Sequence, residues 1–179
     1  MVQLFELGNP TLLKILSFFL RNPTKRVSYS GIRKTLKISK ASLAKHLKFL
    51  LNAGFIKVEI IGLNKIYELK KENATVKQLK ILDNLLITSD IKLLCDKHEI
   101  EIYLYGSAAR GEDIEDSDID LLIIGKISKE QFSSEIASIS KRIEREVKFK
   151  IFSPLEWSKM SRMDIAFYER VEKDKIKLC

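Results

Sequence analysis

The chain has 179 residues and a net charge of +8, and 45% of its residues are hydrophobic. This length accommodates one large or two small domains, and the apolar content is sufficient for folded cores. Because the chain has no apolar run of about 18 residues and no signal-like start, we expect a soluble, cytoplasmic protein that does not enter a membrane.

The charge is unevenly distributed along the chain. Residues 1–88 contain 16 Lys and Arg and 5 Asp and Glu. Residues 89–179 contain 16 Lys and Arg and 19 Asp and Glu. A basic first half is typical of a nucleic-acid-binding domain, although lysines also serve simply to keep a surface soluble. An acid-bearing second half suits a metal or nucleotide site. The asymmetry predicts two domains with different partners.

The first 52 residues predict three helices. The first is expected to begin at Asn9-Pro10, because Asn is a favoured cap and Pro is favoured in the first turn. A short second helix is expected over residues 28–36, and a third from Ser39 to about Asn52. A tight turn between two helices, the second of them basic, is the helix-turn-helix pattern. Much of the exposed surface of the third helix is formed by Lys40, Ser42, Lys45 and Lys48.

A β-hairpin is expected after the third helix, with residues 55–61 and 65–69 flanking Gly62-Leu63-Asn64. The segment ISKASLAKHLKFLLNAGFI at residues 38–56 resembles the recognition helix and wing entry of winged helix-turn-helix transcriptional regulators of the small repressor type. The resemblance extends over residues 8–70. It implies a recognition helix in the major groove of DNA and a wing that places Lys65 near a flanking phosphate. The candidate contacts that it implies on the recognition helix, to phosphates or base edges, are Lys40, Ser42, Lys45 and Lys48. Winged helices also serve as protein-docking modules, and that alternative stays open.

Residues 73–98 predict connecting helices, because their leucines keep helical spacing. The apolar face is broad enough to pack on both domains or on a second copy of the chain. Since paired half-sites in DNA require paired recognition helices, we expect a homodimer. The predicted organisation is a winged helix at 1–72, a helical linker at 73–98 and a second domain at 99–179.

The second domain contains the most informative stretch of the chain, YGSAARGEDIEDSDIDL at residues 105–121. Apolar runs on either side predict two strands joined by a loop, with Asp118 and Asp120 at the start of the second strand. Because side chains alternate along a strand, both carboxylates point the same way. They repel each other unless they are well solvated or a cation lies between them, and a hard divalent ion, Mg2+ or Mn2+, prefers such oxygen ligands.

This stretch resembles the signature of the minimal nucleotidyltransferases, within the polymerase-beta-like superfamily that includes kanamycin nucleotidyltransferase. The resemblance covers residues 89–179 and implies a mixed β-sheet flanked by helices, a nucleoside triphosphate as donor and nucleotidyl transfer to a hydroxyl. Gly106, Ser107 and Arg110 become candidate nucleotide-binding residues, since glycine permits close backbone approach and the other two can bind phosphate. Asp118 and Asp120 become candidate metal ligands and catalytic residues.

The strand expected at residues 146–152 departs from the family pattern. The family supplies a third carboxylate here, but the polar face carries Lys148 and Lys150, and Glu146 would serve only in a shifted register. Farther along, Tyr168 and Arg170 could approach a nucleotide. Cys95 and Cys179 lie far apart without metal-ligand spacing, so we expect both to be incidental in a reducing compartment.

The prediction is therefore an α/β (α+β) protein with two domains. It is a DNA-binding transcriptional regulator whose second domain binds a nucleoside triphosphate and Mg2+, with turnover in question because lysine replaces the third carboxylate. The alternative is an active, antitoxin-like nucleotidyltransferase that modifies a toxin, another protein or a small-molecule hydroxyl. In a third interpretation both domains are protein-docking modules.

Overall fold

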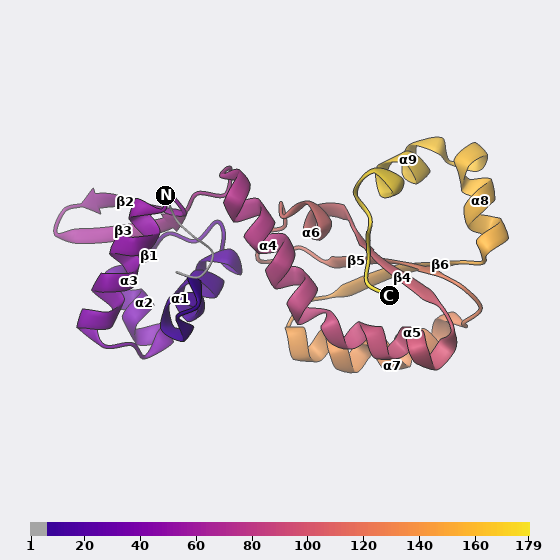
Figure 1. The fold of residues 1–179 in the computed structure, drawn as a ribbon, viewed down its shortest axis with the longest axis horizontal. Helices are drawn as coiled ribbons and strands as arrows, with labels where there is room; N and C mark the ends of the chain where they lie inside the picture. Colours follow the sequence, from indigo (N-terminus) through magenta and orange to yellow (C-terminus); the bar gives the residue numbers. More distant parts are fainter. Residues whose placement is uncertain (1–6) are drawn as a thin grey trace. The chain divides into compact units, whose positions relative to one another are not determined.

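The computed structural model describes residues 7–179 and separates into two compact units, with the boundary between Lys80 and Ile81 (Figure 1). Helices and strands are mixed in both units, which confirms the predicted α/β class. None of the helices in the described part of the chain combines the length and apolar character needed to cross a bilayer.

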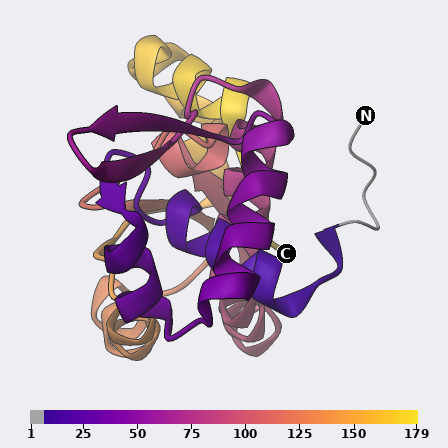
Figure 2. The same ribbon diagram turned by 90° about the vertical axis from the view of Figure 1, so that its left-hand side faces the viewer.

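The first unit is a winged helix, as predicted. Its elements are α1 (Pro10–Leu20), β1 (Val27–Ser28), α2 (Tyr29–Leu36), α3 (Lys40–Asn52), β2 (Ile56–Ile61), β3 (Asn64–Leu69) and the start of α4 (Ala74–Ile87). The side chains of Asn9, Ser28 and Ser39 cap α1, α2 and α3. The antiparallel sheet has the order β1-β3-β2. Its β2–β3 hairpin extends away from the helices (Figure 2).

A single apolar core holds the three helices of this unit together. The predicted stripe of Leu43, Leu47 and Leu50 on α3 is almost completely buried, together with Ile15 and Phe19 of α1. The pairing of β1 with β3 was not expected, because two residues are too short for periodicity to reveal a strand. The core leaves the opposite side of α3 to solvent.

The second unit is a four-stranded mixed sheet between helices. After the remainder of α4 it contains η2 (Ser89–Ile91), α5 (Lys92–His98), β4 (Glu101–Tyr105), α6 (Gly106–Arg110), β5 (Ile119–Ile124), α7 (Lys129–Ile143), β6 (Val147–Phe152), α8 (Pro154–Met163), α9 (Ile165–Asp174) and β7 (Ile176–Lys177). The sheet order is β6-β5-β4-β7, with β5 and β6 parallel and the other pairs antiparallel.

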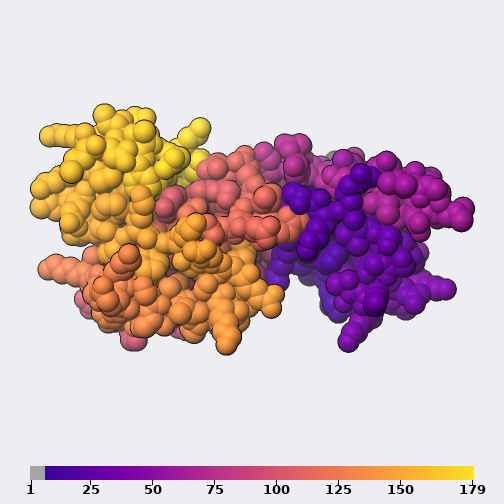
Figure 3. All heavy atoms as spheres, turned by 180° about the vertical axis from the view of Figure 1, so that it is seen from behind, coloured from indigo at the N-terminus to yellow at the C-terminus, as the bar shows by residue number. Residues whose placement is uncertain are grey.

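Each face of this sheet has its own helical layer. Helices α5 and α7 pack on the face that contains Leu104 and Leu121, whereas α8 and α9 pack on the face that contains Leu122 (Figure 1). In the space-filling view, α7 (orange) and α8 with α9 (orange-yellow to yellow) form separate parts of the surface (Figure 3). The α8/α9 face is the one that carries Asp120, because side chains two residues apart on β5 share a face.

The interpretation of the two cysteines as incidental is wrong. Cys95 of α5 and Cys179 form a disulfide, with their Cα atoms 6.3 Å apart. The chain after α9 returns along β4, where the Leu178 amide donates to the Ile102 carbonyl at 2.9 Å, and this brings Cys179 to α5. The cysteines therefore no longer support a reducing compartment, and sequence spacing alone could not reveal their proximity.

Reduction of this disulfide should destabilise the second unit. A crosslink across so long a loop restricts the unfolded chain, and its loss typically costs about 2–4 kcal/mol. We expect dithiothreitol to lower the denaturant midpoint of the wild type to that of Cys179→Ser, and to leave the variant unchanged. Two alkylatable thiols in the denatured, unreduced wild type would contradict the bond.

Candidate functional site

The structure brings Asp118 and Asp120 together at the start of β5. Asp120 lies between Tyr105 of β4 and Lys148 of β6 in the sheet register. Burial first, and then the charge of Asp118, raise the pKa of Asp120 above its ordinary value. Lys148, Arg170 and then Arg110 act in the opposite direction. The site thus contains a half-buried carboxylate whose charge is only partly offset by nearby cations.

Gly106 is needed where β4 turns into α6. Its φ is +75°, and a Cβ atom there would lie 2.6 Å from Oδ2 of Asp120. Any side chain would therefore strain the backbone and push the carboxylate aside. Glycine was expected here to let the backbone approach a phosphate. In the structure it lets the turn that carries Ser107 lie against Asp120.

Arg110 is held by carboxylates of the protein itself. Its Nε donates to Glu112 at 2.8 Å and its Nη1 to Asp174 at 3.2 Å. The hydrogen bond to Glu112 is the main reason that the pKa of Arg110 is raised. Arg110 therefore ties α6 to α9 at the border of the acidic pair, and a phosphate would have to share the guanidinium with these acids.

Lysine occupies the position on β6 where a third carboxylate was expected. Lys148 lies in register with Asp120, and its Nζ contacts Oδ2 of Asp118 at 2.5 Å. The hydrogen bond from Lys148 to Asp118 is the main reason that the pKa of Lys148 is raised. The observed register leaves Glu146 before the strand. Lys148 thus supplies a positive charge where the resemblance predicted an acid.

A buried polar network holds the loop that leads to Asp118. Arg145 donates from Nη1 to Asp113 at 3.0 Å and to Asn84 at 3.2 Å. Its Nε and Nη2 donate to the carbonyls of Ser117 at 2.8 Å and Asp118 at 3.3 Å. Sequence reasoning missed this network. The one available signal was a polar Asn84 within the apolar stripe of α4.

The donor set limits the metal that this site could hold. Among residues 7–179, no group of three or more His, Cys, Asp or Glu side chains is arranged to hold a metal ion. Asp118 and Asp120 offer two carboxylates. Mg2+ is commonly held by one or two carboxylates together with substrate phosphates and water, so the pair fits a metal that arrives with a nucleotide.

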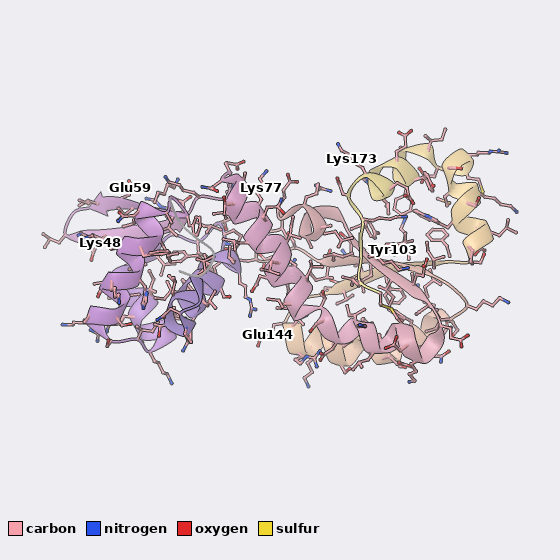
Figure 4. All side chains as sticks on the ribbon, viewed as in Figure 1. Lys48, Glu59, Lys77, Tyr103, Glu144 and Lys173 are labelled. Carbon is pink, nitrogen blue, oxygen red and sulfur yellow. A yellow bond between two sulfur atoms is a disulfide. The ribbon has the colours of Figure 1, made fainter. Side chains whose placement is uncertain are left out.

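The predicted DNA contacts lie on the exposed side of the first unit. Lys40, Lys45 and Lys48 are exposed on α3, Ser42 is partly exposed, and Lys65 is exposed near the hairpin turn. Lys48 projects from α3 toward solvent (Figure 4). Their shared exposure is compatible with contact to a large polyanion.

A further basic hollow lies where α2 turns into α3. It is lined by Ser30, Arg33, Lys34, Lys37 and Ile38. The sequence analysis did not predict a role for Arg33, Lys34 and Lys37, although three basic residues within five positions were a signal. In a helix-turn-helix the first helix crosses the DNA backbone, so this hollow extends the candidate interface.

Two segments of the chain match models of known protein families. Residues 9–58 match the model of the bacterial regulatory protein, arsR family, and residues 90–173 match the model of a nucleotidyltransferase domain. No curated protein and no solved structure matches the chain. The predicted fusion of a regulator-type helix-turn-helix to a nucleotidyltransferase domain is confirmed.

Asp120→Asn should stabilise the protein at neutral pH in a chelating buffer. Because the folded-state pKa of Asp120 is raised, its charge costs stability increasingly as the pH rises through that pKa. In acid the variant and the wild type should have the same free energy of unfolding, and the variant should become the more stable of the two as the pH rises from about 3 to 7. By contrast, an average substitution destabilises a protein by about 1 kcal/mol. The measurement is urea unfolding across this pH range.

The exposed Asp116→Asn in the preceding loop is the matched control and should change little at any pH. An Asp120→Asn variant that is less stable than the wild type at pH 7 would contradict the idea that this carboxylate is electrostatically strained.

Proposed function

We propose that this chain, which joins an ArsR-family helix-turn-helix domain to a nucleotidyltransferase domain, is a transcriptional regulator whose second domain binds a nucleoside triphosphate with Mg2+. The observation that carries the proposal is the Lys148–Asp118 ion pair beside Asp120. The site keeps two of the acids that bind a metal and lacks the third. Binding is therefore its proposed role, and transfer is not.

The first domain is proposed to bind the DNA backbone and major groove through α3. Lys40, Lys45 and Lys48 supply phosphate contacts, Ser42 lies among them, and Lys65 extends the contact along the hairpin. The surplus of lysine and arginine in residues 1–88 favours a polyanionic partner. Two copies would read paired half-sites, so we propose a homodimer with 1–72 as the DNA-binding domain, 73–98 as the linker and 99–179 as the nucleotide-binding domain.

The second domain is proposed to hold the triphosphate where β4 meets α6. Gly106 and Ser107 form the turn beside Asp120, and Arg110 stands at its border. Asp118 and Asp120 would hold Mg2+, which when bound neutralises charge on the phosphoryl groups. To bind the metal, Asp118 must exchange its contact with Lys148, whose ammonium can then turn to a phosphate.

Lys148 also argues against catalytic turnover at this site. A third carboxylate could accept the proton of an attacking hydroxyl. The raised pKa of Lys148 keeps its side chain protonated near neutral pH, so it cannot accept that proton. In this position the lysine favours retention of a nucleotide over its transfer.

The affinity for DNA should depend steeply on salt, and α3 should carry much of that dependence. Each phosphate contact contributes about 0.9 to the slope of log affinity against log salt. The combined Lys40→Ala, Lys45→Ala and Lys48→Ala variant should therefore reduce the slope by about 2–3, as measured by fluorescence anisotropy with duplex DNA. Lys129→Ala on α7 is the control. Affinity that is insensitive to salt would contradict DNA binding through these lysines.

Lys148→Asp should increase the affinity for Mg2+ in the absence of nucleotide by at least about tenfold. The change removes a cation from beside the two carboxylates and adds a third oxygen ligand, and both effects favour a divalent cation. Lys148→Gln, which only removes the cation, should fall between the two in calorimetric titration. Equal Mg2+ affinity in all three proteins would contradict the assigned role of Lys148.

The proposal also requires that the wild type bind at least one of ATP, CTP, GTP and UTP with Mg2+ in calorimetry. Transfer of label from ATP to a protein in cell extract would contradict the absence of turnover. If that labelling were lost in the combined Asp118→Ala and Asp120→Ala variant, the antitoxin-like enzyme would be favoured instead.

A further inference from the structure

Two cations share one aromatic ring on the α8/α9 face of the second unit. The Nζ of Lys150 lies 4.1 Å from the centroid of the Phe167 ring, and the Cζ of Arg170 lies 5.7 Å from the same centroid. Lys150 extends from β6, whereas Phe167 and Arg170 lie one turn apart on α9. Phe167 is 5% exposed, and both cationic residues are exposed to solvent.

In the described part of the chain, neither of these two cations has an acid beside it. Lys148 contacts Asp118, Lys175 contacts Glu172 and Lys177 contacts Glu101, but within residues 7–179 no carboxylate lies within ion-pair distance of Lys150 or Arg170. At an exposed site, contact with an aromatic ring stabilises a cation only weakly. Two like charges held together in this way attract an anion.

The pair lies near the acidic residues. Lys150 is two positions beyond Lys148 on β6, so its side chain leaves the same face of the sheet. Arg170 is close enough to Asp120 and Tyr105 to act on both electrostatically. Tyr103 lies on this face as well (Figure 4). An anion bound here would lie beside a metal held by Asp118 and Asp120.

We propose that Lys150 and Arg170 form an anion subsite for a phosphate group beside the acidic pair. The inference rests on the proposed nucleotide-binding function and adds a second phosphate-binding group to the turn at Gly106. The guanidinium of Arg170 presents paired donors that match phosphate oxygens, and Lys150 supplies a point charge. The phosphate belongs either to the triphosphate of the nucleotide or to a second, phosphorylated ligand.

The alternative is that both stems merely cover Phe167 with their methylene groups. Uncharged replacements that keep methylene groups over the ring, Lys150→Met and Arg170→Gln, separate these possibilities. Inorganic pyrophosphate is the first probe, and its binding to the full chain is measured by calorimetry. We expect each variant to weaken binding by about tenfold, the loss of one charge-assisted hydrogen bond, and Arg170→Lys to restore part of it.

The matched controls are Lys159→Met and Arg162→Gln on α8, which should bind pyrophosphate as the wild type does. Unchanged melting curves show that the variants fold. Pyrophosphate binding that is equal in the wild type, Lys150→Met and Arg170→Gln would overturn the subsite, as would a loss of the same size in the α8 controls.

A competition measurement identifies the source of the phosphate. If pyrophosphate competes with Mg2+-ATP, the subsite binds the triphosphate. If both bind together, it binds a second ligand. Failure of the two inferences can be told apart, because Arg170-dependent pyrophosphate binding without any Mg2+-nucleotide binding would uphold the subsite and overturn the proposed function. If Mg2+-nucleotide bound equally well with and without the Arg170 side chain, and pyrophosphate did not bind, the proposed function would stand and the subsite would be overturned.

Discussion

Two carboxylates on one face of β5 are the constraint around which the second unit is arranged. Asp120 is half-buried and Asp118 is close enough to raise its pKa further, so positive charge must be supplied to offset them. The chain provides part of it through Lys148. Glycine at position 106 fits this arrangement, because its φ is +75° and a Cβ atom would lie only 2.6 Å from Oδ2 of Asp120. A carboxylate whose charged form is disfavoured by burial and by a second acid is typical of a binding site.

Two residues outside the stretch 105–121, Arg145 and Asn84, help to hold these acids in place. The loop that leads into β5 has carbonyl groups without strand partners, and Arg145 satisfies those of Ser117 and Asp118. The charge of Arg145 is neutralised by Asp113, and Asn84 of α4 accepts a further hydrogen bond from its guanidinium. Such a buried network is stable only when every member is bonded, so it holds the loop in one geometry. The position of Asp118 thus depends on three segments far apart in the sequence.

Local patterns were sufficient to predict much of this protein. The leucine stripe of α3, the hairpin after Gly54 and the shared face of Lys148 and Lys150 follow from periodicity and turn residues within a few positions. Contacts between distant segments could not be predicted in this way. The Cys95–Cys179 disulfide, the β7–β4 pairing and the Arg145 network each depend on how the sheet brings remote residues together. Likewise, the break between α8 and α9 at Asp164 lies within a continuous apolar pattern.

The central claim is that the acidic pair exchanges an internal cation for a metal that arrives with a nucleotide. The most direct measurement is anomalous diffraction from crystals grown with Mn2+ and a non-hydrolysable nucleoside triphosphate analogue. The account predicts a Mn2+ peak between Asp118 and Asp120, with the Lys148 ammonium withdrawn from Asp118. Density for the nucleotide elsewhere, or the Lys148–Asp118 contact intact with no Mn2+ peak, would contradict it.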